Sequence, residues 1–279
     1  DVKEVHNYVV AMEYGIKRLK TLPVSLRLMR ELHEHLMKGV RGDHATPGEF
    51  RRTQNWIGPA GCTLNTATYV PPPIPEMQEA LNQLEKFIHA EAEYPPLIRI
   101  GLIHYQFESI HPFIDGNGRI GRLLISILLA NWDLLPLPLL YLSAFFERRR
   151  HEYYDHLLNI SSQGAWREWL FFLTGVTEQA HDAIDRATRL QDLQQEWRKR
   201  LQTSRRTSVL LLQLADELFR TPILTVPNIQ KTLKVTHRAA NKMVERLIDL
   251  KILKPVPGKA RNRQFEAKAI LNILDANTL

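Results

Sequence analysis

The chain contains 279 residues, of which 44% are hydrophobic, and its formal net charge is +7. This length suits roughly two domains, and the composition is ordinary for a soluble globular protein. Cys62 is the only cysteine, so an internal disulfide is excluded and a reducing, cytoplasmic environment is expected. No apolar run reaches the roughly 18–20 residues of a membrane span, so we expect no contact with a membrane.

Most of the chain is predicted to be helical. Residues 24–37 and 74–92 repeat apolar residues at intervals of three and four, as amphipathic helices do. Residues 95–104 and 123–130 are apolar segments that frame a polar loop, and residues 165–183 open a further helix with aromatic side chains. Residues 178–206 are polar but keep a helical apolar stripe, which predicts a long connecting helix packed on a neighbour or on a second subunit.

Histidines in these helices could suggest a metal site. His33 and His35 are two residues apart, so they point to different faces of their helix and cannot chelate one ion together. The metal interpretation therefore fails. His104, in the helix before the polar loop, is expected to be a satisfied structural residue.

The polar loop is the most informative stretch of the chain. Residues 111–122 read His-Pro-Phe-Ile-Asp-Gly-Asn-Gly-Arg-Ile-Gly-Arg. Gly116 and Gly118 let backbone amides converge on an anion, and the helix that follows would direct its positive N-terminal end to the same point. Arg119 and Arg122 are three residues apart on that helix, so both guanidiniums can bind phosphate oxygens.

Two further side chains of the loop can carry chemistry. Asp115 offers a hard oxygen ligand for Mg²⁺, which proteins commonly hold through one or two carboxylates together with substrate phosphates. Histidine titrates close to neutrality, so His111 suits a general base. The loop therefore predicts transfer of a phosphorus centre to a nucleophile, with catalysis by positioning and charge neutralisation.

Three other interpretations of the loop are weaker. Residues 116–121 spell Gly-x-Gly-x-x-Gly, but the dinucleotide fingerprint needs a preceding strand and an acidic residue about twenty positions on. Here a helix precedes, and Asp133 comes too early. A calcium loop needs glycine and glutamate where Ile120 and Ser126 stand. A simple helix-capping turn explains the glycines, but not the histidine, the aspartate and the two arginines around them.

At every specified position, residues 111–122 resemble the signature of the Fic family, His-Pro-Phe-x-Asp/Glu-Gly-Asn-Gly-Arg-x-x-Arg. The resemblance implies a mainly α fold, with a Fic-type helical domain and a short β-hairpin flap. It also implies an enzyme that transfers AMP from ATP to a Tyr, Thr or Ser hydroxyl of a target protein. It implies that His111 deprotonates this hydroxyl and that Asp115 holds Mg²⁺. The remaining residues of the implied ATP site are Phe113 (a buried anchor), Ile114, Gly116, Asn117, Gly118, Arg119 and Arg122.

Two features place the chain within the variety of this family. Gly118 argues against the phosphate-transferring toxin branch, which tends to carry lysine at that position. Many Fic proteins also carry an inhibitory helix with the motif Ser/Thr-x-x-x-Glu-Gly/Asn, whose glutamate pairs with the second motif arginine, here Arg122. No such motif occurs in these residues. Because the chain begins with Asp1 and reads at once as a helix, we expect an upstream segment outside it, and autoinhibition of the full protein stays open.

Two segments before the motif are similar to family features. Residues 48–58 resemble the stretch before the Fic flap, and residues 62–71 alternate β-branched side chains as a short hairpin does. In the family this flap aligns the target by adding a strand to it. The resemblance therefore assigns target docking to Thr63, Leu64 and Asn65, whereas an ordinary surface hairpin is the simpler alternative.

Residues 148–154 resemble the segment after the active helix whose tyrosine lines the adenine pocket. Tyr154 is the candidate for that role. The simpler alternative is a half-buried helical tyrosine without a ligand.

Beyond residue 206 a different domain is predicted. Residues 208–219 form an apolar helix, and Thr225 begins a short second helix as its N-cap, just before a proline. A third helix over 237–249 follows a tight turn. Two short strands, 252–256 and 263–266, then flank a basic loop as a wing. This order resembles a small C-terminal winged helix-turn-helix domain.

Positive charge is concentrated in this part of the chain. Residues 200–279 contain 15 Lys and Arg but 6 Asp and Glu, whereas the remaining residues carry a net charge of about −2. A basic face is an electrostatic footprint of nucleic-acid binding, although winged helices also serve as protein-docking or dimer modules. The start of the third helix and the wing supply the candidate DNA contacts Arg238, Asn241, Lys242, Lys259, Arg261 and Arg263.

The sequence thus predicts a Fic catalytic domain at residues 1–177, a connecting helix at 178–206 and a winged helix-turn-helix domain at 207–279. The predicted function is protein adenylyl transfer, with ATP as co-substrate and Mg²⁺ as cofactor. Two alternatives stay open: a DNA-binding regulator that uses the Fic site as a nucleotide sensor, and a Fic enzyme that uses another nucleotide donor or removes AMP. Besides the target protein, DNA and a second copy of the chain are candidate partners.

Overall fold

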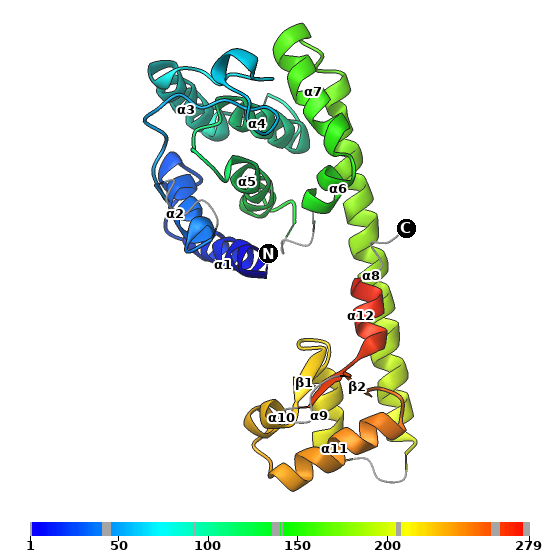
Figure 1. The fold of residues 1–279 in the computed structure, drawn as a ribbon. Helices are drawn as coiled ribbons and strands as arrows, with labels where there is room; N and C mark the ends of the chain where they lie inside the picture. Colours follow the sequence, from blue (N-terminus) through cyan, green and yellow to red (C-terminus); the bar gives the residue numbers. More distant parts are fainter. Residues whose placement is uncertain are drawn as a thin grey trace. The chain divides into compact units, whose positions relative to one another are not determined.

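The computed structural model of the chain describes residues 2–40, 46–91, 93–135, 140, 142–204, 208–257 and 263–275. The chain divides into two compact units, Asp1–Ala180 and His181–Leu279, and the boundary falls within helix α8 (Phe171–Gln202). Figure 1 shows the helices and strands of the chain. Each unit has its own hydrophobic core.

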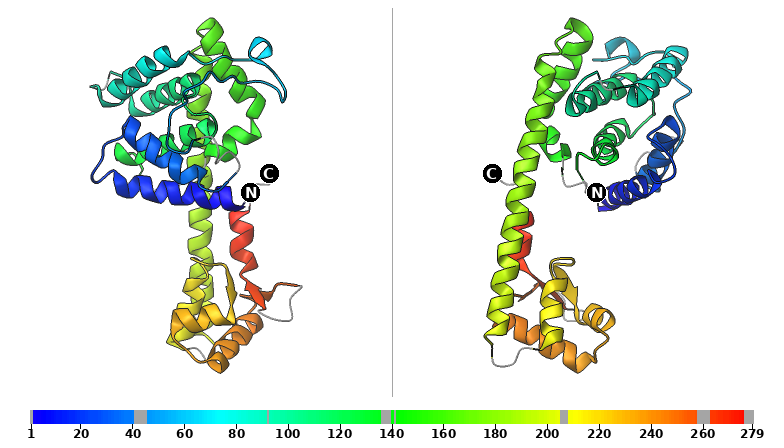
Figure 2. Two further views of the ribbon diagram at one scale, coloured as in Figure 1. Left: turned by 60° about the vertical axis from the view of Figure 1, so that its left-hand side comes forward. Right: turned by 180° about the vertical axis from the view of Figure 1, so that it is seen from behind.

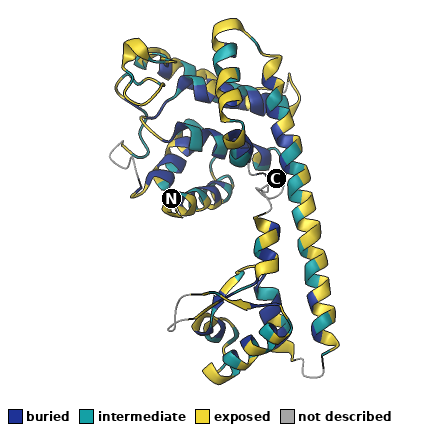
Figure 3. Ribbon diagram, turned by 45° about the vertical axis from the view of Figure 1, so that its right-hand side comes forward, coloured by how far each residue is buried: buried dark blue, intermediate teal, exposed yellow. Residues whose placement is uncertain are grey.

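Helix α5 (Asn117–Asn131) is the centre of the first unit. It contacts α1, α2 and α4, and it is buried along most of its length (Figure 3). Its sequence explains this position, because it is almost entirely apolar or small between residues 120 and 129. The other elements of the unit are α1 (Val2–Arg18), α2 (Leu26–Met37), the 3₁₀ turn η1 (Leu64–Thr66), α3 (Ile74–His89), α4 (Pro96–Ile110), α6 (Leu142–Arg148), α7 (Arg150–Gln163) and the 3₁₀ turn η2 (Glu168–Leu170).

The two amphipathic helices predicted near the start of the chain are confirmed as α2 and α3. α2 begins after Ser25, whose hydroxyl accepts a hydrogen bond from the Leu28 amide, and its apolar stripe is buried. α3 carries Pro75 in its first turn, where no amide hydrogen is needed. Both helices therefore begin where local chemistry favours a helix start.

The helix predicted over residues 165–183 is only partly correct. Gly164 ends α7 in the left-handed conformation, and residues 165–170 form turns and η2. Trp169 is buried there, and its indole nitrogen donates a hydrogen bond to the Gly101 carbonyl oxygen at 2.9 Å. This anchor to α4 holds an irregular turn, and α8 then runs unbroken from Phe171 through most of the predicted connecting helix.

The predicted flap hairpin does not form regular strands. Ile57 and Tyr69 make a single antiparallel bridge, and η1 lies between them in place of an alternating strand. The Thr66 hydroxyl accepts a hydrogen bond from the Thr63 amide at 2.9 Å, and the Thr66 amide donates to the Thr63 carbonyl oxygen at 3.0 Å. Local bonds of this kind compete with strand pairing, so the alternation of β-branched residues is misleading here.

The second unit combines the end of α8 with a small antiparallel sheet in the order β1-β3-β2. The predicted helices and the two predicted strands are present, and Thr225 caps α10 as expected. The sequence pattern does not predict β1, which has only three residues. The elements are α9 (Val209–Glu217), β1 (Ile223–Thr225), α10 (Val226–Leu233), α11 (His237–Asp249), β2 (Lys254–Pro255), β3 (Gln264–Glu266) and α12 (Lys268–Leu274).

The core of this unit gathers Trp197, Leu214, Leu247 and Phe265, and α10 packs against α9, α11 and β1 (Figure 2). The winged helix-turn-helix assignment stays a prediction. Residues 258–262 of the wing loop, including Lys259 and Arg261, lie outside the described residues. No helix in the described ranges is both long and apolar enough to cross a bilayer.

Arg99 of α4 caps the end of α3 from inside the first unit. It is 7% exposed, and its Nη2 donates to the carbonyl oxygens of Phe87 and Ala90 at 3.0 Å and of Ile88 at 3.4 Å. Its guanidinium carbon also lies 4.7 Å from the ring centre of Trp132. The last carbonyls of a helix lack partners within the helix, so a buried cation takes the place of a C-terminal cap.

We expect Arg99→Met to lower the free energy of unfolding by about 1–3 kcal/mol, because it leaves buried carbonyl oxygens without a donor. Arg99→Lys keeps the charge but loses the planar fork, so it should lose less stability. Urea denaturation followed by circular dichroism measures both values. A Met variant as stable as the wild type would contradict this assignment.

Candidate active site

The polar loop forms a tight turn between α4 and α5. His111 is the C-cap of α4 with φ 48° and ψ 59°, and Gly116 is the N-cap of α5 with φ 81°. A left-handed conformation is easy for glycine but uncommon for a residue with a Cβ, and it persists only where the surroundings impose it. The question is therefore what holds His111 in place.

Arg51 and Asn55 hold it. Arg51 is 2% exposed, and its Nε donates to the His111 carbonyl oxygen at 3.1 Å. The Asn55 amide donates to the carbonyl oxygens of His111 at 3.3 Å and Phe113 at 3.0 Å. The Arg51 backbone amide adds a bond to the Pro112 carbonyl oxygen at 2.8 Å. Both residues lie in the segment that precedes the flap, and sequence reasoning assigned them no role.

Asn117 closes the turn with its own side chain. Its Oδ1 accepts from the Phe113 amide and its Nδ2 donates to the Phe113 carbonyl oxygen, each at 2.8 Å. The side chain is thus committed to structure, and only its backbone amide can serve the predicted anion cradle. Phe113 is fully buried, as its predicted role as an anchor requires, whereas Ile114 is 41% exposed.

The His111 ring is fixed as a neutral tautomer. Its Nδ1 lies 3.3 Å from the Glu108 carbonyl oxygen, which can only accept a hydrogen bond, so Nδ1 carries the proton. Burial, with a smaller contribution from the positive charge of Arg51, lowers the pKa of His111 to about 4. The lone pair on Nε2 is therefore available near neutral pH, which is the state a general base needs.

The charged residues of the motif surround the start of α5. The Asp115 carboxylate is half-exposed; its Oδ1 accepts from the Gly116 amide at 2.6 Å and lies 3.7 Å from Nη2 of Arg119. The Arg119 Nη1 also lies 3.7 Å from the Glu4 carboxylate. The Arg122 Nε donates to the Ser143 hydroxyl at 3.1 Å. The turn thus brings one carboxylate and two guanidiniums to one helix start.

Asp115 is the residue of the turn that could hold a metal. Within the described ranges, no group of three or more His, Cys, Asp or Glu side chains is arranged as a metal site. A single half-exposed carboxylate fits Mg²⁺ when substrate phosphates supply further oxygens. The donor set therefore suits a metal that arrives with a nucleotide.

A buried polar cluster lies behind α5. The Glu108 carboxyl packs against Gly121, where an added Cβ would overlap its Oε1. Burial raises the pKa of Glu108 to about 7. His104 Nε2 shares a hydrogen bond with the Tyr153 hydroxyl at 3.0 Å, whereas its buried Nδ1 has no hydrogen-bond partner among the described residues. The expected satisfaction of this structural histidine is therefore met at one nitrogen only. The missing side chain of Gly121 thus leaves the space that the Glu108 carboxyl occupies.

The flap residues and Tyr154 are on the surface. Thr63, Leu64 and Asn65 are exposed, and the Tyr69 hydroxyl ties the flap to α4 by donating to the Ser109 carbonyl oxygen at 2.9 Å. Tyr154 is 49% exposed, with the Arg150 guanidinium 5.7 Å from its ring centre. The structure does not enclose Tyr154 in a pocket, and its predicted contact with adenine stays a prediction.

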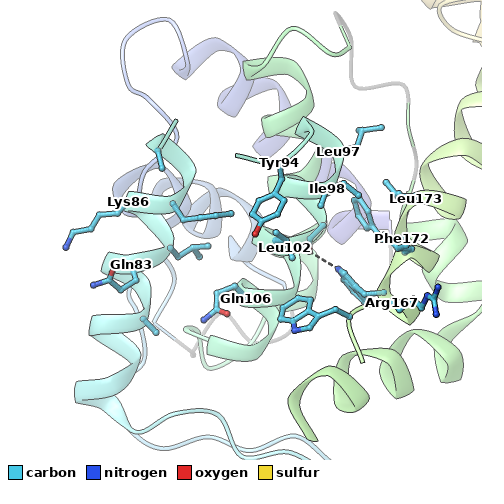
Figure 4. A pocket seen from close by; sticks show the side chains of 18 residues that line it. Gln83, Lys86, Tyr94, Leu97, Ile98, Leu102, Gln106, Arg167, Phe172 and Leu173 are labelled. Atoms are coloured by element: carbon cyan, nitrogen blue, oxygen red, sulfur yellow. Dashed lines mark hydrogen bonds between the residues drawn. The ribbon is translucent and has the colours of Figure 1, made fainter. Parts of the chain in front are cut away.

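One cavity of the first unit lies away from the turn. Its volume is about 970 Å³, and it is lined by residues of α3, α4, η2 and the start of α8 (Figure 4). Leu97, Ile98 and Leu102 form its floor, and Gln106 lies at one side. No residue of the motif lines it, so this cavity gives no support for a nucleotide site. The candidate for such a site rests on the side chains of the turn alone.

Comparison with known proteins agrees with this geometry. Residues 23–129 match the model of the Fic/DOC family. The protein adenylyltransferase Fic of Drosophila grimshawi is 30% identical over 214 residues, which cover 74% of this chain and 40% of that protein. The protein of the same name from Culex quinquefasciatus is 28% identical over 185 residues, which cover 63% of this chain and 33% of that protein. This chain therefore spans well under half the length of both relatives.

A crystal structure of a Fic family protein from Desulfovibrio desulfuricans G20 shares the fold, with a TM-score of 0.57 at 20% identity, covering 95% of this chain and 74% of that one. Fold and motif together define the class of the first unit, a mainly α-helical domain with a polar turn between two buried helices. The chain is a Fic family protein, and residues 23–129 are its Fic domain.

The His111 imidazole should stay neutral, with its proton on Nδ1, from about pH 8 to about pH 5, because burial lowers its pKa to about 4. Nitrogen NMR of ring-labelled histidine reports both the charge and the tautomer, and His111→Asn identifies the signal. A titration midpoint near the unperturbed value of about 6.5 would contradict the neutral base.

Proposed function

We propose that this chain transfers AMP from ATP to a Tyr, Thr or Ser hydroxyl of a target protein and releases pyrophosphate. The observation that carries the proposal is the neutral His111, whose Nε2 lone pair is free while its backbone is held in a left-handed conformation. The similarity to proteins named protein adenylyltransferase Fic supports the same chemistry.

In the proposed reaction, Nε2 of His111 accepts the proton of the target hydroxyl as its oxygen attacks the α-phosphorus of ATP. The bond between the α-phosphorus and the bridging oxygen breaks, and pyrophosphate leaves with that electron pair. Arg119 and Arg122 bind the β- and γ-phosphates, and the backbone amides of residues 116–118 face the same anion. Mg²⁺ held by Asp115 would neutralise phosphate charge.

The proposed docking of the target uses the flap. Its backbone between Ile57 and Tyr69, which includes residues 63–65, would pair with an extended segment of the target, which places a hydroxyl close to His111. Thr63, Leu64 and Asn65 are exposed and available for this contact. Recognition through backbone atoms places few demands on the target sequence.

The alternatives for this site are a nucleotide sensor that transfers nothing, a transferase with another nucleotide donor such as UTP, and an enzyme that removes AMP. A sensor needs no base, whereas the turn holds His111 neutral with one nitrogen free. This observation favours catalysis over sensing.

The test is incubation of the protein with α-labelled ATP, Mg²⁺ and cell lysate. We expect label on protein, and His111→Ala should reduce labelling by about 10²–10⁴-fold, because removal of a general base typically costs that much. ATP binding should be retained. His35→Ala is the matched control, since His35 lies on α2 and its ring contacts Tyr14 at a tilted angle of 40°.

Each alternative has its own signature in this experiment. Tight ATP binding without label in any lysate indicates a sensor. Label from α-labelled UTP but not from ATP indicates another donor. Release of AMP from a previously labelled protein indicates removal.

We also propose that the second unit is a winged helix-turn-helix domain that binds DNA through α11. The order helix, strand, helix, helix and two strands supports this fold. Arg238 and Lys242 are exposed and four residues apart near the start of α11, so they share one face, and Arg263 is exposed beside β3. The Asn241 amide already donates to His237 Nδ1 and its carbonyl oxygen, each at 3.0 Å, and would have to exchange these bonds to read a base.

Replacement of Arg238 and Lys242 by alanine should weaken the binding of duplex DNA. The slope of the logarithm of the binding constant against the logarithm of the salt concentration should fall by about one unit for each lost phosphate contact. Arg238→Ala and Lys242→Ala are also compared singly with Lys268→Ala, which removes one positive charge from an exposed position of α12 in the same unit. Gel-shift titration at several salt concentrations measures the DNA affinity and its salt dependence. Absence of salt-dependent affinity in the wild type would favour a protein-docking module.

A further inference from the structure

His33 of α2 is a buried residue to which the proposed reaction gives no role. It is fully buried, its ring stacks on Phe113 with centres 3.8 Å apart and planes at 6°, and it lies against the turn that carries Asp115. A polar ring in such a place must find partners for both nitrogens. Its two partners lie on different segments of the chain.

Those partners determine which nitrogen carries the proton. The Gly48 amide donates to Nδ1 at 2.9 Å, so Nδ1 is unprotonated. In the neutral ring the proton is therefore on Nε2, which donates to the Asp115 carbonyl oxygen at 3.0 Å. Burial lowers the pKa of His33 to about 4, which keeps this tautomer near neutral pH.

The bond to Asp115 fixes the orientation of one peptide group. In a planar trans peptide the carbonyl oxygen and the amide hydrogen point in opposite directions. Because the Asp115 carbonyl points to α2, the Gly116 amide points away from α2, where it meets the Asp115 Oδ1 at 2.6 Å. This amide is the first of those proposed to face the phosphates, and in the proposed complex it would exchange its bond to Oδ1 for one to a phosphate oxygen.

The packing around Gly116 supports the same arrangement. A Cβ added to Gly116 would lie 2.9 Å from the Met37 sulfur and 3.3 Å from the His33 Nε2. Met37 follows His33 by one helical turn, and its sulfur contacts the Arg119 guanidinium at 3.4 Å. One face of α2 thus supports the turn from Asp115 to Arg119.

We propose that His33 is a positioning residue that holds the Asp115–Gly116 peptide with its amide towards the nucleotide phosphates. Its second bond, from Gly48, ties this peptide to the start of the segment that carries Arg51 and Asn55. The His33 ring therefore aligns both the Gly116 amide and the segment whose Arg51 and Asn55 side chains bind the His111 carbonyl oxygen. This role rests on the proposed nucleotide site, but it predicts the affinity for MgATP independently of whether AMP is transferred.

Two amide side chains separate the two bonds of the ring. Glutamine can place its Nε2 near the position of the imidazole Nε2 and keep the bond to Asp115, whereas asparagine can place its Oδ1 near the position of Nδ1 and keep the bond from Gly48. We expect His33→Asn to weaken the binding of MgATP by roughly 10–100-fold, as loss of an orienting partner typically does. His33→Gln should stay close to the wild type.

The measurements are calorimetric titration with ATP at several Mg²⁺ concentrations, thermal unfolding, and transfer of α-label. His35→Asn and His35→Gln are the matched controls on the same helix. If wild-type protein binds MgATP but transfers no AMP, the proposed function fails while the comparison of the two His33 variants still decides this proposal. Equal weakening in His33→Asn and His33→Gln would show that the bond to Asp115 is not what matters.

A measurement on the wild type covers the case in which the variants do not fold. Nitrogen NMR should show the His33 ring neutral, with its proton on Nε2 and slow exchange of that proton with water. A proton on Nδ1 would overturn the proposal, because the ring could then not donate to Asp115.

Discussion

The candidate site of the first unit depends on hydrogen bonds to the backbone carbonyl oxygens of the polar turn between α4 and α5. An unpaired buried carbonyl costs about as much as a lost hydrogen bond. The carbonyl oxygens of residues 111, 112, 113 and 115 each accept a bond, and the donors are His33, Arg51, Asn55 and Asn117. Three of these donors come from segments at least 56 residues away along the chain. The turn therefore takes its shape from the fold around it, and the position of His111 follows from that shape.

This mode of construction also sets the electrostatics of the site. Burial lowers the pKa of His33 and His111 to about 4 and of His104 to about 3. Histidines in the unfolded chain take up protons near pH 6.5. Between about pH 4 and 6.5 these three histidines therefore bind more protons in the unfolded state, which outweighs the one proton that the folded state holds on Glu108. The free energy of unfolding therefore falls as the pH drops through that window. The same burial that provides a neutral base makes the domain sensitive to acid.

The sequence predicts the parts of this site that are adjacent along the chain and misses those that are distant. The spacing of His111, Asp115 and the glycines locates the turn, and apolar periodicity locates α2, α3 and α5 around it. Periodicity cannot show which turn a buried polar side chain faces, so Arg51, Asn55 and His33 have no role in the prediction. The pairing of His33 with His35 even directs attention to chelation, whereas each ring nitrogen of His33 binds a backbone group. The flap and residues 165–170 are mispredicted for a related reason, since local bonds in one case and the Trp169 anchor in the other override the sequence pattern.

The contrast between turn and flap has a consequence for the proposed function. The turn is held by buried side chains that each donate a hydrogen bond to one of its carbonyl oxygens. A side chain of another shape would leave that carbonyl oxygen without a donor. The flap is exposed and is held near the turn by the bridge between Ile57 and Tyr69 and by the bond from the Tyr69 hydroxyl to Ser109. Since the bridge uses backbone atoms alone, most flap side chains can change without disturbing it. Under the proposed docking, such a domain would change its target through the flap while the geometry of His111 stays the same.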